Sequence, residues 1–73
     1  MGHVPSYWWD FESAAGRVTG VIVESDDDRF PVVGRFVLGD QDAAADLQVS
    51  MAERMIADLK AGRADPRKLA KAV

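Results

Sequence analysis

Residues 6–38 contain three short runs of apolar residues, separated by turn-like polar stretches, which predict β-strands. Residues 6–12 predict a first strand, because aromatic side chains favour strands and alternate there with polar ones. Residues 17–24 and 30–38 are rich in valine and predict a second and a third strand. The acidic stretch 25–29 between them has hairpin length, so these two strands are expected to pair antiparallel.

The second and third predicted strands are apolar on both faces. Strict alternation places Val18 and Ile22 on one face of the second strand and Val21 and Val23 on the other. On the third strand it groups Phe30, Val32, Phe36 and Leu38 on one face, and Val33 and Val37 on the other. A sheet with one solvated face normally alternates more cleanly. One helix covers one face only, so the pattern predicts a second cover, for which a second copy of the chain is the simplest candidate.

Apolar residues spaced three and four apart predict one long amphipathic helix over residues 41–61. Asp40 or Asp42 is a suitable N-cap, and Gly62 is placed to end the helix. Asp65 followed by Pro66 then predicts either one short helix or a solvated tail. The expected fold is α+β, a three-stranded antiparallel meander with one long helix (βββα) and an optional short C-terminal helix. Residues 1–62 form the single domain, and residues 63–73 form the basic tail or short helix.

Length and composition limit how such a chain is stabilised. The 73 residues form one small domain whose core alone supplies little stability. The chain has no cysteine and one histidine, His3, which excludes disulfides, a cysteine-based zinc site and a histidine cluster. Oligomerisation remains as a source of stability, so we expect a homodimer. No apolar run spans a bilayer and no signal-peptide pattern is present, so we expect a cytoplasmic protein without a membrane partner.

Charge is distributed unevenly along the chain. Residues 1–62 carry five basic and eleven acidic side chains, a net charge of −6, whereas residues 63–73 carry a net charge of +3. The four basic residues of the tail are Arg63, Arg67, Lys68 and Lys71. An acidic body argues against a general nucleic-acid binder, so nucleic acid is the less favoured partner. The tail still leaves open a nucleic-acid-linked regulator.

The sequence offers little equipment for catalysis. The run Asp26–Asp28 could bind a hard cation, but it lacks the spacing of a calcium-binding loop and is typical of a solvated hairpin loop. A carboxylate pair could be drawn from Asp10, Glu12 and Glu24, yet no spacing singles one out. We therefore expect no enzymatic activity, no cofactor and no metal.

The aromatic residues of the first strand are the most informative candidates for a binding surface. Trp8 and Trp9 are consecutive, so on a strand they must face opposite sides. One can enter the core beneath the helix, while the other is exposed, covered by the same chain or buried in an interface. Aromatic residues are common anchors of protein interfaces. The predicted interface residues are Tyr7, Trp8, Trp9 and Phe11.

Residues 17–61 resemble HicB-type antitoxin domains in outline. The likeness rests on an acidic hairpin loop, a strand ending near Gly-Asp and an alanine-rich acidic helix. The corresponding residues are Ser25-Asp26-Asp27-Asp28, Gly39-Asp40 and Ala43-Ala44-Ala45. The aromatic strand stands where that family has its first helix, and the family's glycine-cysteine-phenylalanine run is missing. The chain also resembles small phage-encoded β-hairpin–helix proteins of unknown function, and neither likeness transfers a site.

These observations predict a small non-enzymatic protein–protein interaction module. The expected role is that of a phage or mobile-element protein that binds and modulates a host protein; the phage origin is what the resemblance implies, and the protein binding follows from the acidic body and the aromatic residues. The alternative is a regulator of antitoxin type that uses the basic tail on nucleic acid.

Overall fold

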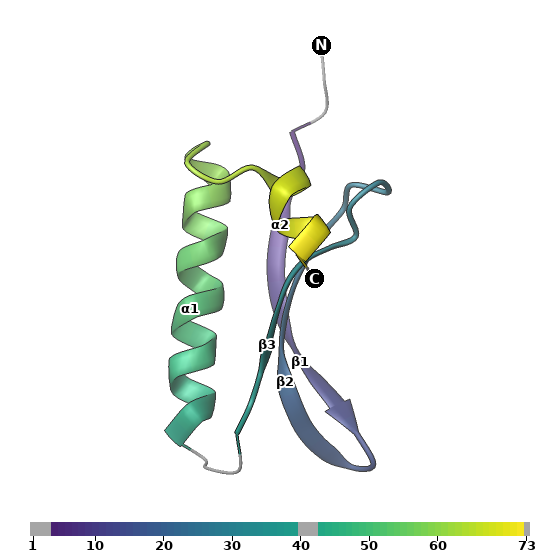
Figure 1. The fold of residues 1–73 in the computed structure, drawn as a ribbon, viewed down its shortest axis with the longest axis vertical. Coiled ribbons are helices and arrows are strands. Elements are labelled where there is room, and N and C mark those ends of the chain that lie inside the picture. Colours follow the sequence, from purple (N-terminus) through teal and green to yellow (C-terminus); the bar gives the residue numbers. More distant parts are fainter. Residues whose placement is uncertain (1–3, 40–42, 73) are drawn as a thin grey trace.

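The structure is a computed structural model that describes residues 4–39 and 43–72 (Figure 1). Its strands are β1 (Tyr7–Ala14), β2 (Arg17–Ser25) and β3 (Val32–Val37), and its helices are α1 (Ala43–Lys60) and α2 (Pro66–Ala72). The sheet order is β1-β2-β3, and both pairs are antiparallel. The predicted α+β βββα fold is confirmed, with its short C-terminal helix. The proposed N-caps Asp40 and Asp42, like His3, lie outside the described residues.

A two-residue turn joins β1 to β2. Ala15 and Gly16 both have positive φ, 53° and 75°, which gives the turn the twist that a tight hairpin needs. Ala14 pairs with Arg17, so β1 extends two residues beyond the predicted strand. Glycine adopts this conformation without cost, whereas Ala15 adopts a region that is uncommon for residues with a Cβ.

The acidic loop between β2 and β3 is closed by Ser25, which is only 6% exposed. Its hydroxyl donates a 2.7 Å hydrogen bond to the carbonyl of Phe30, and its backbone N–H donates to the carbonyl of Pro31. The hydroxyl also accepts a 3.3 Å bond from the N–H of Asp27. The buried hydroxyl is thereby satisfied, and the predicted β2–β3 hairpin is confirmed.

A β-bulge changes the alternation along β3. Val23 pairs with Gly34 and Glu24 with Val32, so Val33 is an extra residue between them. Val33 is fully buried in the core beside Phe36. The expectation that Val33 shares a face with Val37, and Val32 with Phe36, is therefore wrong. The reason is physical, since one inserted residue moves every later side chain to the opposite face.

The core lies between the sheet and α1. Its buried apolar residues are Val21, Val23, Val33, Ala52 and Leu59. Gly34 lets the helix come close, because a Cβ added there would lie 2.5 Å from the Sδ atom of Met55. Each described helix is too short or too polar to cross a bilayer.

The end of α1 and the start of α2 follow the predicted signals. Gly62 has φ 76°, its N–H donates to the carbonyl of Leu59, and the N–H of Arg63 donates to the carbonyl of Asp58. This is the Schellman arrangement that ends a helix. Asp65 then caps α2 by accepting a 2.9 Å bond from the N–H of Arg67.

The α2 segment packs on the core instead of extending into solvent. It lies against β3, and Leu69 and Ala64 contact the hydrophobic cluster on the same side as α1. Of the two alternatives that the sequence left open for residues 63–73, the short helix forms and the solvated tail does not. Of the described elements, none covers the other face of the sheet (Figure 1).

Candidate functional site

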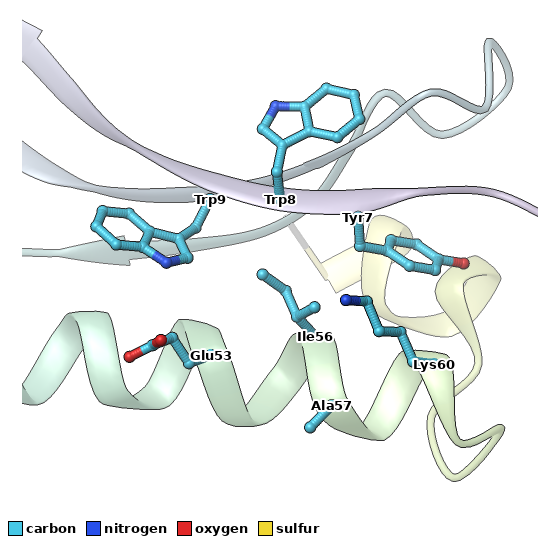
Figure 2. A pocket seen from close by; sticks show the side chains of 7 residues that line it. All are labelled: Tyr7, Trp8, Trp9, Glu53, Ile56, Ala57 and Lys60. Atoms are coloured by element: carbon cyan, nitrogen blue, oxygen red, sulfur yellow. The ribbon is translucent and has the colours of Figure 1, made fainter.

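The aromatic residues of β1 divide between two surfaces. Tyr7 and Trp9 point toward α1, whereas the ring of Trp8 points away from it (Figure 2). Trp9 packs against the core and meets Phe11 edge to face, with ring centroids 5.3 Å apart. Trp8 is 43% exposed. The structure thus answers which tryptophan enters the core, and it does not bring the four predicted interface residues onto a single face.

The sheet surface opposite α1 is called the open face. It comprises Trp8, Asp10, Glu12, Ile22, Glu24, Val32, Arg35 and Val37. Trp8 and Val37 are exposed, and Ile22 and Val32 are half-buried. Glu24 is the direct cross-strand neighbour of Trp8, and Asp10 is two residues further along β1. The open face therefore combines apolar side chains with flanking carboxylates.

One ion pair crosses the open face. The carboxylate of Glu12 on β1 lies 3.2 Å from the Nε atom of Arg35 on β3. Gly20 on β2 lies between these strands and pairs with Glu12. A Cβ on Gly20 would lie 2.5 Å from the carbonyl oxygen of Phe36, so this position admits no side chain without a backbone shift.

A groove of about 440 Å³ lies between β1 and α1 and is called the β1–α1 groove. Its lining residues are Tyr7, Trp8, Trp9, Glu53, Ile56, Ala57 and Lys60. Trp8 borders the groove through its position on β1, while its ring points to the open face (Figure 2). The helical residues were not predicted as a site. Their spacing in the sequence could have indicated a shared surface, since positions 53, 56, 57 and 60 lie on one face of a helix.

The acidic loop uses two of its three carboxylates within the protein. Asp26 Oδ1 accepts a 2.9 Å bond from the N–H of Ser6, and the Asp27 carboxylate accepts bonds of 3.0 and 3.2 Å from the backbone and side chain of Arg29. Within the described residues no three histidine, cysteine or acidic side chains gather as metal ligands. The loop instead affects Tyr7, whose pKa is raised by burial and then by the charges of Asp27 and Asp26.

The remaining carboxylates proposed from the sequence, Asp10, Glu12 and Glu24, all lie on the open face. Asp10 Oδ1 accepts a 2.7 Å bond from the N–H of Phe11, and Glu12 is paired with Arg35. Their contacts are structural, and the arrangement forms no nucleophile–base pair.

The basic residues proposed for nucleic acid lie at and beyond the end of α1. Arg63 contacts Asp58 at 2.9 Å, so part of its charge is compensated. Arg67, Lys68 and Lys71 are exposed on the seven-residue α2. The structure therefore brings three cations onto one short helix.

Comparison of the chain with protein-family models, with curated proteins and with solved structures finds no match. The open face and the β1–α1 groove are the two surfaces of the described residues that suit a binding partner.

Proposed function

We propose that this chain is a small non-enzymatic protein-interaction module that binds through the open face and works as a homodimer. One observation carries the proposal: Trp8 is 43% exposed on a sheet face that no other described element covers. Exposed aromatic side chains are common anchors of protein interfaces. A host protein is proposed as a further partner of the same face.

The small core supports the need for additional burial. The three largest fully buried side chains are all valines: Val21, Val23 and Val33. Small domains without disulfides or metals commonly gain stability by association. Two open faces meeting about a two-fold axis would bury Trp8 together with Ile22, Val32 and Val37.

The charges of the open face give the association a characteristic salt dependence. Glu12 is compensated by Arg35, whereas Asp10 and Glu24 remain as acidic groups beside Trp8. Two copies therefore bring like charges together, and added salt screens their repulsion. Self-association should strengthen as salt is raised.

Sedimentation equilibrium at micromolar concentration tests the proposal. The expected result is a reversible dimer that Trp8→Ala weakens by about 2 kcal/mol or more. Leu47→Ala is the matched control, because Leu47 is 59% exposed on α1, away from the open face, and its loss should leave the dimer intact. A monomer mass at every concentration, with Trp8 exposed, contradicts the homodimer.

A second candidate function uses the three cations of α2 on nucleic acid. It predicts DNA binding whose affinity falls steeply with salt, opposite to the dimer. Substitution of Lys68 and Lys71 by alanine should then remove the binding. Absence of DNA binding at low salt contradicts this candidate.

A further inference from the structure

The outer edge of β1 carries backbone groups that point away from the sheet. The N–H of Asp26 donates to the carbonyl of Ser6, which identifies these two residues as a hydrogen-bonded pair. Such pairs alternate along an antiparallel ladder, so Trp8 and Asp10 also bond to β2. Tyr7, Trp9 and Phe11 therefore direct their N–H and C=O groups outward.

Two independent bonds agree with this alternation. The N–H of Ser25, the β2 residue opposite Tyr7, donates to Pro31 on the β3 side. The N–H of Phe11 is taken by the side chain of Asp10, as expected for a donor that does not face β2. Asp10 thereby blocks one end of the edge, and Tyr7 and Trp9 remain as an open segment.

The same segment borders the β1–α1 groove. Ile56 and Ala57 are the apolar residues that α1 contributes to the groove, and Ile56 points toward β1 (Figure 2). Glu53 lies at the Trp9 end and Lys60 at the Tyr7 end. Both charged side chains are exposed, so the groove is acidic at one end and basic at the other.

We propose that an extended segment of a protein partner adds to β1 as an antiparallel strand and places alternate side chains in the β1–α1 groove. The inference rests on the proposed function, since it assumes that the chain binds protein, but it uses a different surface. Strand addition draws affinity from backbone bonds and specificity from alternate side chains. The other edge strand of the sheet is β3, and α2 packs against it.

Charge complementarity sets the chemistry of the segment. An antiparallel strand runs from the Trp9 end toward the Tyr7 end, so it meets Glu53 first and Lys60 last. Three groove-facing residues two apart then read basic, apolar and acidic. The apolar residue lies opposite Trp9, and its own N–H donates to the carbonyl of Trp9.

Fluorescence anisotropy with a labelled peptide containing Lys-Thr-Ile-Thr-Glu tests the register. N-methylation of the isoleucine nitrogen removes the donor to Trp9 and should weaken binding about tenfold or more. N-methylation of the threonine that follows is the matched control, because its N–H points to solvent, and it should leave affinity unchanged.

Charge exchange tests the ends of the groove. Lys60→Glu should weaken binding about threefold, a typical effect for an exposed ion pair, and a peptide ending in lysine should restore it. Lys68→Glu, on α2, is the control and should have no effect. Val37→Ala, on the open face and outside the groove, should leave peptide affinity unchanged while weakening the dimer.

Two results with the peptide would overturn the inference: no binding at millimolar peptide, or equal affinities for the two N-methylated peptides. A third would be protection of the Tyr7 and Trp9 amides from hydrogen exchange that rises with protein concentration in the absence of peptide. The last would place a second copy on the edge. None of these changes the Trp8 dimer test, so the two proposals fail separately.

Discussion

Docking of α2 on the core makes Leu69 a stability determinant. Leu69 is half-buried beside Phe36 and the two methionines of α1, Met51 and Met55. Truncation of a fully buried leucine to alanine costs about 2–5 kcal/mol, so the half-buried Leu69 should cost about 1–2 kcal/mol. Lys68→Ala, on the exposed side of the same helix, should stay within about 0.5 kcal/mol.

Urea unfolding followed by tryptophan fluorescence measures both variants, at one fixed protein concentration because association adds to apparent stability. Removal of residues 63–73 should cost more than Leu69→Ala, since it also exposes Phe36. A Leu69→Ala loss below about 0.5 kcal/mol, equal to that of Lys68→Ala, would refute the docking of α2 as a source of stability.

Three further predictions concern the sheet and its loop. Gly20→Ala should lower the free energy of unfolding in urea by about 1–3 kcal/mol, because the added Cβ would meet the carbonyl of Phe36. Gly39→Ala is the control and should change it by about 0.5 kcal/mol or less, because nothing lies near the added Cβ. Tyr7, the sole tyrosine, should titrate above its ordinary pKa of 10.0 when followed by ultraviolet absorbance. Because Tyr7 deprotonates first in the unfolded state, its ionisation should leave the free energy of unfolding unchanged below pH 10.0 and lower it as pH rises further. Ile56→Asp should abolish cooperative unfolding by circular dichroism, because it places a charge against the core.

Local periodicity was sufficient to predict the order of elements. The two-residue alternation of β1 and the helical spacing of α1 each reflect burial on one face, which the sequence records directly. In β2 the expected grouping of Val18 with Ile22 is wrong, because the register shifts between Glu12 and Ser13 and leaves Thr19 as an extra residue. Gly62 and Asp65 also acted as predicted, because capping depends on neighbouring residues only.

The remaining features depend on contacts between distant residues. The bulge at Val33 is set by the pairing of β2 with β3, and alternation within β3 alone does not reveal it. The four basic residues beyond α1 are typical of a solvated tail, so the sequence alone did not indicate that Leu69 contacts the core. The β1–α1 groove joins residues about 50 positions apart, so neither element indicates it alone.

The proposed dimer buries Trp8 where two open faces meet, and the accessibility of Trp8 to a quencher measures this burial directly. Trp9→Phe leaves Trp8 as the single tryptophan, and Trp8→Phe provides the matched reporter in the groove. Acrylamide quenching of Trp8 should be strong in dilute solution and should fall as protein concentration rises through the dimer transition, while quenching of Trp9 in the Trp8→Phe variant stays constant. Strong quenching of Trp8 at every concentration would contradict the account.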